Sequence, residues 1–245
     1  MKIKKILISQ PAPTNGSPYT DLITKYKINI DFIPFFKVEP VQSKEFRLQK
    51  INIPEFTCVV FTSRTTIDAF FNLCEELRIT VPESMKYFCI SEAIALYLQK
   101  HIVYRKRKIF FGNGTPASII EAIGSKHKLE NFLLTVADNY KSDVNRLFAK
   151  SKLKHSSAIL VKTVSSDLSK LDIKSYDLVV FYSPSDVKSL KENYKDFSQG
   201  TLEFATFGPA TLKALKAAKL NSSVIAPTPE APSIAKALSL YFEQK

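Results

Sequence analysis

The chain has 245 residues, of which 45% are hydrophobic and 11% aromatic, so it can bury one large or two modest cores and wholesale disorder is excluded. Its 35 Lys and Arg residues against 23 Asp and Glu residues give a formal charge of +12, which favours a polyanionic partner. Nucleic acid is disfavoured, because no known nucleic-acid motif is present and no basic stripe carries interleaved aromatic residues. The densest basic cluster, YRKRK at 104–108, is typical of a solvated surface.

Short apolar runs alternate with amphipathic stretches along the whole chain. In the first part we expect a strand at 4–9, a helix from Pro18 capped by Ser17, strands at 57–62, 86–91 and 132–137, a strand and turn at 108–114, and helices at 64–77, 92–100, 116–123 and 142–150. In the rest we expect a strand in YDLVVFYS (176–183) with a helix after it, a strand at 202–208, a helix at 209–220, an extended segment at 222–227 and a last helix at 232–244. This alternation predicts an α/β fold with mainly parallel sheets.

One strand–turn–helix pattern occurs twice. CVVFTSRTTIDAFF (58–71) and LVVFYSPSDVKSLK (178–191) place Ser63 and Ser183 120 residues apart, and Ser91 and Gly208 end the next strands 117 residues apart. Duplication is the simplest explanation and predicts two similar domains. A shared strand–loop pattern without common ancestry is the alternative.

Two extended segments, 28–40 and 156–164, do not fit the alternation of strands and helices. Pro34 and Pro40 argue for an edge or linking position of the first segment. If the two segments pair as a ribbon, the chain leaves its first domain through one and returns through the other. We therefore predict the following domains: 1–34 with 166–245, then 41–155, with 35–40 and 156–165 as linker strands.

Ligands of open α/β sheets bind beyond the carboxyl ends of the strands, where Ser63, Ser91, Ser183 and Gly208 are expected. Two domains facing each other would place these residues around one cleft. Hydroxyls and the backbone N–H groups of helix N-termini are donors for anions. Together with the positive charge, they suit a ligand that bears several carboxylates.

Motifs for other chemistry are weak or missing. GNGTPA at 112–117 formally matches a dinucleotide fingerprint, but Pro116 lies inside it and no acidic residue ends a neighbouring strand at the usual distance. The three histidines show no metal-ligand spacing, and no serine lies in a GxSxG motif. A nucleotide-dependent enzyme remains a hypothesis, and it predicts that Gly114→Asp abolishes function.

The predicted environment is a reducing one. Cys58, Cys74 and Cys89 contain no CxxC pair, and we expect them to be small buried hydrophobic groups. The apolar run near the N-terminus is too short for a secretory signal, and no run approaches the roughly 18 residues of a membrane span. A cytoplasmic protein without a membrane partner is expected.

Several motifs resemble the uroporphyrinogen-III synthase family, in the form found in Bacteroidetes, and the resemblance covers essentially the whole chain. These motifs are FTSR (61–64), KYFCISEAIALYLQK (86–100), RKRKIFF (105–111), the SPS turn (183–185), GPATLKAL (208–215) and IAPTPEAPSIAKAL (225–238). The resemblance implies two similar three-layer α/β/α domains joined by a two-stranded ladder. It also implies a monomer that needs no metal or organic cofactor.

The reaction implied by the resemblance closes hydroxymethylbilane, a linear tetrapyrrole, to uroporphyrinogen III. Water leaves the terminal hydroxymethyl group, and ring D attacks the resulting cation through its substituted carbon. A spiro intermediate forms and fragments, and ring D rejoins inverted. A polycarboxylate substrate agrees with the charge of +12.

The resemblance implies roles for single residues, each at a position that matches a motif of the family. Ser63 and Ser183 match the family's serine turns, and Thr211 matches its G-x-x-T threonine, which either donates to a substrate carboxylate or caps a helix. Ile94 stands at the matching position of the other domain, where Ser91 could substitute. The expected substrate-binding residues are Ser63, Arg64, Thr65, Ser91, Lys162, Thr163, Ser183, Ser185, Gly208 and Thr211.

The chain departs from the family in the second linker. The family usually has Tyr-Arg-Thr there, its tyrosine being the candidate for assisting loss of water, and this chain has Val161-Lys162-Thr163. Tyr182 is the candidate catalytic residue in its place, with a packing role as the alternative. The family's frequent arginine before the first proline is Gln10 here. A non-catalytic two-domain binder of a polycarboxylate is the alternative function.

Overall fold

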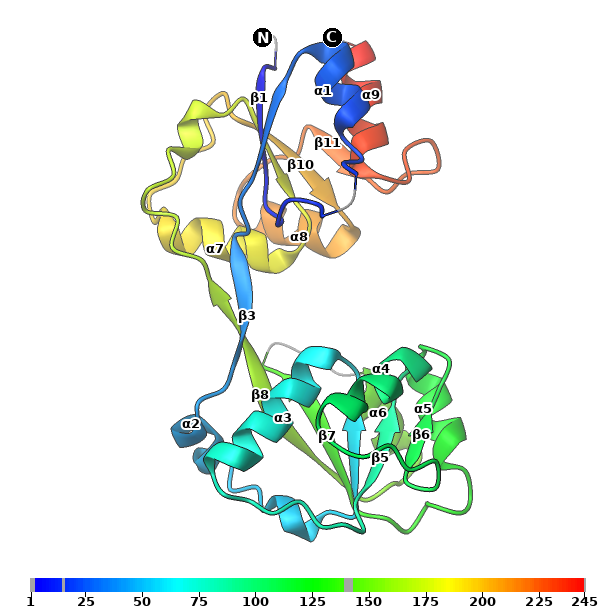
Figure 1. The fold of residues 1–245 in the computed structure, drawn as a ribbon. Coiled ribbons are helices and arrows are strands. Elements are labelled where there is room, and N and C mark those ends of the chain that lie inside the picture. Colours follow the sequence, from blue (N-terminus) through cyan, green and yellow to red (C-terminus); the bar gives the residue numbers. More distant parts are fainter. Residues whose placement is uncertain (1–2, 15, 139–142, 245) are drawn as a thin grey trace. The chain divides into compact units, whose positions relative to one another are not determined.

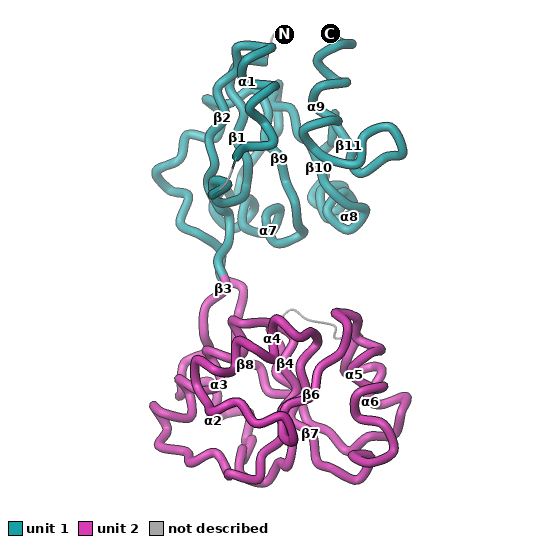
Figure 2. The backbone as a smooth tube through the Cα atoms, turned by 45° about the vertical axis from the view of Figure 1, so that its right-hand side comes forward, with its two compact units in different colours: residues 1–37, 164–245 teal, residues 38–163 magenta. Residues whose placement is uncertain are grey.

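The structure is a computed structural model that describes residues 3–14, 16–138 and 143–244. These residues form two compact units: unit 1 consists of residues 1–37 and 164–245, and unit 2 of residues 38–163 (Figures 1 and 2). Both ends of the chain therefore contribute to unit 1, while unit 2 is one continuous segment.

Unit 1 contains a five-stranded sheet in the order β11-β10-β9-β1-β2, in which all neighbouring strands are parallel. Its strands are β1 (Lys5–Ile8), β2 (Asn29–Phe32), β9 (Leu178–Phe181), β10 (Glu203–Phe207) and β11 (Val224–Ala226). The central strands β1 and β9 are almost entirely buried, because helices cover both faces of the sheet.

Successive residues of these strands point to opposite faces and into separate cores. Ile6, Ile8 and Val180 pack with α1 (Thr20–Tyr26) and α9 (Ile234–Glu243). Leu7 and Val179 pack with α7 (Pro184–Asn193) and α8 (Pro209–Ala217) on the other face. A short 3-10 turn, η3 (Ile173–Ser175), precedes β9. Unit 1 is thus a three-layer α/β/α unit.

Unit 2 contains a six-stranded sheet in the order β3-β8-β7-β4-β5-β6, with parallel pairing from β8 to β6. Its strands are β3 (Phe36–Pro40), β4 (Cys58–Phe61), β5 (Lys86–Cys89), β6 (Ile109–Phe111), β7 (Phe132–Ala137) and β8 (His155–Ser165). One face is covered by α2 (Ser43–Leu48), α3 (Arg64–Glu76), α4 (Glu92–Tyr97) and the 3-10 turns η1 (Ile53–Glu55) and η2 (Leu98–Lys100). The other face is covered by α5 (Pro116–Ile123) and α6 (Asp143–Lys150).

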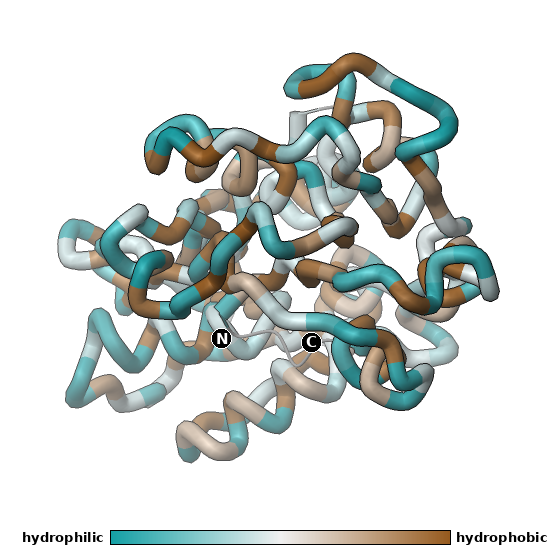
Figure 3. The backbone as a smooth tube through the Cα atoms, turned by 90° about the horizontal axis from the view of Figure 1, so that it is seen from below, coloured by the Kyte–Doolittle hydropathy of each residue, from teal (hydrophilic) through white to brown (hydrophobic). Residues whose placement is uncertain are grey.

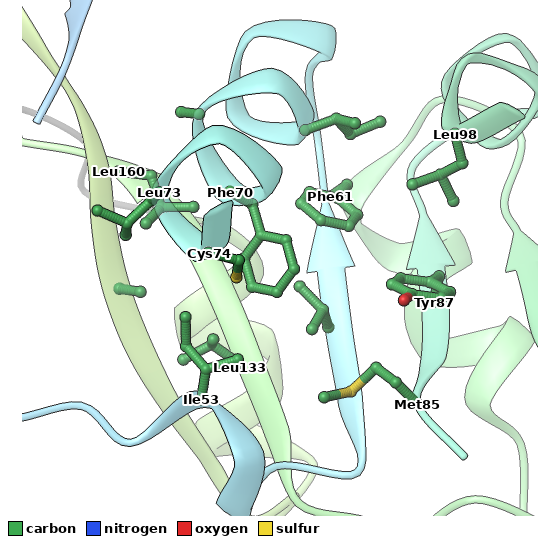
Figure 4. Packing of buried hydrophobic residues seen from close by; sticks show 14 of the residues in the cluster. Ile53, Phe61, Phe70, Leu73, Cys74, Met85, Tyr87, Leu98, Leu133 and Leu160 are labelled. Atoms are coloured by element: carbon green, nitrogen blue, oxygen red, sulfur yellow. The ribbon is translucent and has the colours of Figure 1, made fainter. Parts of the chain in front are cut away.

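The apolar residues of α3 are spaced so that they lie on one side of the helix and pack into the core of unit 2. Phe70, Leu73 and Cys74 lie on the side of α3 that faces the sheet, where Phe61 of β4 and Leu133 of β7 meet them (Figure 4). All three cysteines are buried as free thiols, and burial raises the pKa of each to about 12. The prediction that the cysteines are buried hydrophobic groups is confirmed.

The strands β3 and β8 are neighbours in the sheet and form the predicted two-stranded ladder. The Ser166 N–H donates to the Phe35 carbonyl at 2.8 Å, and the Val41 N–H donates to the Leu160 carbonyl at 2.9 Å. The predicted fold class, two α/β units of mainly parallel strands with a ladder between them, is confirmed.

Several helices have bounds that differ by two or three residues from the sequence prediction, and the structure explains the differences in α1 and α2. Helix α1 begins at Thr20 and not at Pro18, because the Ser17 hydroxyl and carbonyl accept the N–H groups of Tyr19 and Thr20 and close a turn instead. Helix α2 was not predicted, since its six residues bury only Phe46 and give no helical periodicity. In the described ranges, no helix is long and apolar enough to cross a membrane, and hydrophobic and hydrophilic stretches alternate over short distances (Figure 3).

Candidate functional site

The carboxyl ends of β1, β9 and β10 lie side by side in unit 1. The pairing register places Ile8 beside Val180 and Thr206 beside Phe181. The Ser9 N–H then donates to the Val180 carbonyl at 3.1 Å. The residues that follow these strands are therefore brought to one edge of the sheet, among them the predicted site residues Tyr182, Ser183, Ser185, Gly208 and Thr211.

A buried carboxylate organises the turn between β9 and α7. One oxygen of Asp186 accepts the N–H groups of Tyr182 and Ser183, both at 2.8 Å. Asp186 is only 1% exposed, and burial raises the pKa of its carboxyl group, although the two N–H donors oppose this shift. The hydroxyls of Ser9 and Ser183 also act on this carboxyl group and oppose the rise of its pKa.

Gly208 begins the next loop and is the N-cap of α8. Its φ of 84° and ψ of 148° lie in a region that side chains strongly disfavour, so glycine is required here. Gly208 has no side chain that could cap this helix, and the N–H groups of Ala210 and Thr211 in the first turn have no intrahelical acceptor. Thr211 is the third residue of the helix and only 2% exposed, so it does not act as the cap. The first turn of α8 presents uncapped donors to an anion.

The carboxyl edge of unit 2 carries the corresponding residues after β4 and β5. Ser63 caps α3, and its Oγ accepts the Thr66 N–H at 3.2 Å. Arg64 and Thr65 in the first turn are exposed, and the Arg64 guanidinium lies 5.3 Å from the centre of the Tyr97 ring. Ser91 follows the neighbouring strand and is the N-cap of α4, without a side-chain cap bond.

Lys162 and Thr163 lie on β8, two strands away from β4 in the sheet. The Lys162 ammonium contacts both carboxylate oxygens of Glu45, at 2.7 and 2.9 Å. The Thr163 N–H donates to Asp138 at 3.0 Å. Val161 is 3% exposed and belongs to the core of unit 2, so the position of the family's linker tyrosine is filled here by a packing residue.

Tyr182 is paired with a residue from the opposite end of the chain. Its hydroxyl and the hydroxyl of Tyr19 form a short hydrogen bond, in which either oxygen could donate. Burial raises the pKa of both phenols, so both stay protonated at neutral pH. Tyr182 also packs on Phe207, with 5.7 Å between ring centres. The hydroxyl of Tyr182 is thus held in place by Tyr19 and is protonated at neutral pH.

Other features from the sequence are not among the predicted site residues, although GNGTPA follows β6 and its Asn113 forms a β-bridge with Ser91. A pocket of about 240 Å³, lined in part by Tyr87, Arg105 and Lys108, lies at the amino ends of β5 and β6, whereas Ser91 follows the carboxyl end of β5. In GNGTPA, a side chain on Gly112 would collide with Ser118, so packing explains this glycine. Among the described residues, no three His, Cys, Asp or Glu side chains form a group that could hold a metal ion.

Sequence reasoning missed Asp186, Ser9 and Tyr19. Asp186 could have been found, because Ser183 and Asp186 have the spacing of a capping box. Tyr19 gave no local signal, because its partner Tyr182 is 163 residues away.

Two units of parallel strands, each with hydroxyl and N–H donors at its carboxyl edge, define an α/β protein suited to an anionic ligand. Comparison with protein families matches residues 17–236 to the family described as uroporphyrinogen-III synthase HemD. The match covers most of the chain, which therefore belongs to the HemD family of uroporphyrinogen-III synthases.

Solved structures agree with this assignment at the level of the fold. Uroporphyrinogen-III synthetase from Helicobacter pylori is similar with a TM-score of 0.58 and 14% identity, covering 99% of this chain and 100% of that chain. A mutant uroporphyrinogen III synthase from Thermus thermophilus is similar with a TM-score of 0.52 and 12% identity, over 99% and 100% of the two chains. The comparison with curated proteins finds no match.

Proposed function

We propose that this chain is a hydro-lyase that closes hydroxymethylbilane to uroporphyrinogen III, with inversion of ring D and loss of water, and that it needs no cofactor. The family match over residues 17–236 carries this proposal. The charge of +12 supports it, because the substrate is a polycarboxylate. We further propose that the protein acts as a monomer in the cytoplasm, which size-exclusion chromatography and cell fractionation test.

The catalytic task is mainly one of positioning. The bilane cyclises unaided to the isomer without inversion, so the protein must hold it in the shape that leads to the spiro intermediate. Positioning of reacting groups is worth about 7–11 kcal/mol in favourable cases. We assign substrate carboxylates to the first-turn donors of α8, including Thr211, and of α3, including Arg64 and Thr65.

The remaining candidate residues differ in whether their side chains are already engaged within the protein. Ser63 is occupied as a cap and is proposed to fix the turn before α3, whereas Lys162, which is held by Glu45, is proposed to fix β8 and to add positive charge. Ser91, Thr163, Ser183 and Ser185 are proposed as hydroxyl or N–H donors to the substrate. Gly208 keeps the backbone conformation that leaves the α8 donors free.

Loss of water needs a donor at the hydroxymethyl oxygen, and we assign this role to Tyr182. The C–O bond breaks, its electron pair leaves with the oxygen, and a proton reaches that oxygen. The electron pair of the pyrrole nitrogen stabilises the cation that remains. The phenol is protonated at neutral pH, so it has a proton to donate, while the burial that raises its pKa makes it a weaker acid.

The deciding experiment generates hydroxymethylbilane in situ, adds the protein, oxidises the product and separates the porphyrin isomers. Predominant isomer III is expected. The spontaneous isomer I alone would leave a non-catalytic binder of the polycarboxylate as the better description. Tyr182→Phe is expected to lower kcat by about tenfold or more if the phenol assists loss of water, and unchanged kcat would assign Tyr182 to packing.

A further inference from the structure

The phenol of Tyr19 is placed to act on the reaction through Tyr182. Tyr19 precedes α1, is 4% exposed and packs against Phe32, with 5.9 Å between ring centres. Tyr182 follows β9 and is more exposed than Tyr19. Their hydroxyls meet within unit 1, although the two residues are 163 positions apart in the sequence.

The surroundings decide which hydroxyl donates. Within the described ranges, the Tyr19 hydroxyl has no hydrogen-bond partner other than Tyr182. A buried O–H without an acceptor is costly, so the Tyr19 O–H is expected to donate its hydrogen bond to the Tyr182 oxygen. The Tyr182 hydroxyl, on the less buried side, then keeps its own hydrogen for an outside acceptor.

We propose that Tyr19 is a positioning residue whose O–H donates to the Tyr182 oxygen, while the Tyr182 O–H donates to the leaving oxygen of the substrate hydroxymethyl group. This inference rests on the proposed function. As the Tyr182 proton moves to the leaving oxygen, negative charge grows on the Tyr182 oxygen, and the Tyr19 hydrogen bond stabilises it. The proton is restored later, because ring closure releases one proton from a pyrrole carbon.

Asp186 completes the arrangement from the backbone side. Its carboxylate accepts the Tyr182 N–H at 2.8 Å, so Tyr182 is fixed at its backbone by Asp186 and at its hydroxyl by Tyr19. A donor fixed at both ends needs little reorganisation when the substrate arrives, which is how preorganised hydrogen bonds accelerate reactions.

The test is a double-mutant cycle on kcat with Tyr19→Phe, Tyr182→Phe and the double variant. Tyr19→Phe is expected to lower kcat about 10-fold with little change in KM, because it removes a hydrogen bond that strengthens only in the transition state. The double variant is expected to have the kcat of Tyr182→Phe alone, since the two phenols act as one unit.

Tyr194→Phe is the matched control. Tyr194 also lies in unit 1, and its hydroxyl donates to the carbonyls of Leu168 and Leu171, at 2.9 and 2.6 Å. This variant loses the same kind of atom and is expected to unfold at lower urea concentration with kcat unchanged. If Tyr19 served only packing, Tyr19→Phe would behave like this control.

Each outcome is decisive. A wild-type protein that forms isomer III, together with wild-type kcat in Tyr19→Phe or in Tyr182→Phe, would overturn the inference and leave the proposed function intact. Multiplying losses of kcat in the double variant would also overturn it. A wild-type protein that yields only isomer I would remove the proposed function itself.

Discussion

Ser183 has the backbone conformation and the helix-capping position that Ser63 has 120 residues earlier. Their φ and ψ angles are −143° and 158° for Ser183, and −149° and 158° for Ser63. The third residue of the following helix differs: it is Thr66 in unit 2 and Asp186 in unit 1. The same turn is therefore held by a hydroxyl in one unit and by a buried carboxylate in the other.

Asp186→Ala is expected to lower the free energy of unfolding by about 1–3 kcal/mol, because the partly buried N–H groups of Tyr182 and Ser183 lose their acceptor. Asp186→Asn is expected to cost less, since it keeps one oxygen that accepts. Urea denaturation of the three proteins measures the difference. Thr66→Ala is the matched comparison in unit 2, because it removes the hydroxyl that holds the corresponding turn there. An Ala variant as stable as the wild type would contradict the role of Asp186.

Thr211→Val is expected to raise KM for the bilane about tenfold or more, because a hydrogen bond to a charged carboxylate is worth about 1.5–3 kcal/mol. The shape of the buried side chain is kept, so the free energy of unfolding should change little. Steady-state kinetics gives KM, with Thr24→Val as the control, since the Thr24 hydroxyl only returns to the Thr20 carbonyl of α1. Equal KM values for the two variants would exclude Thr211 from binding.

The ion pair between Lys86 and Glu130 predicts loss of stability in acid. Burial works against the ionised Glu130 carboxylate, but hydrogen bonds from Lys86 and Thr57 outweigh it and hold its pKa below the ordinary value of 4.5. Since the folded pKa lies below the unfolded one, the pair stabilises the fold above that ordinary value and this contribution is lost as the pH falls through the folded pKa.

Glu130→Gln should therefore lower the free energy of unfolding at pH 7 by about 1 kcal/mol or less. The gap to the wild type should shrink as the pH falls below the ordinary value of 4.5. Urea denaturation across this pH range measures it, with Glu76→Gln at an exposed site of α3 as the control. A gap that stays constant over this pH range would contradict a stabilising contribution from the ionised Glu130 carboxylate.

Val161→Tyr restores the family's linker residue and should still give no gain in kcat. Val161 packs in the core of unit 2, so the larger side chain is expected to cost about 1–3 kcal/mol through overpacking. Ile159→Tyr, at a half-buried site on the same strand, should cost less. Denaturation and the isomer assay measure both effects, and a stable variant with raised kcat would contradict this account.

Local patterns in the sequence predicted most of the architecture. Runs such as CVVF and LVVF are buried on both faces, and that composition already indicates central parallel strands. The placement of the candidate site residues after these strands was also predictable, since parallel strands bring their carboxyl ends to one edge. Helix α2 was not, because its burial of Phe46 alone leaves no period to detect.

Contacts between distant segments account for the parts that were not predicted. The pairing of Tyr19 with Tyr182, and of Lys162 with Glu45, depends on side chains more than 100 residues apart. The packing of Val161 depends on a register shift opposite Val136 and Ala137, which lets both Leu160 and Val161 enter the same core. No local rule of periodicity reports such an irregularity.

During synthesis of the chain, unit 2 is completed before unit 1, because unit 1 needs both ends of the chain. Strands β1 and β2 leave the ribosome first, but β1 lies between β2 and β9 in its sheet and has no partner on one side until residue 178 has been made. Unit 2 is one uninterrupted segment and can fold as soon as β8 emerges. The early strands of unit 1 therefore keep an open edge while unit 2 is being made.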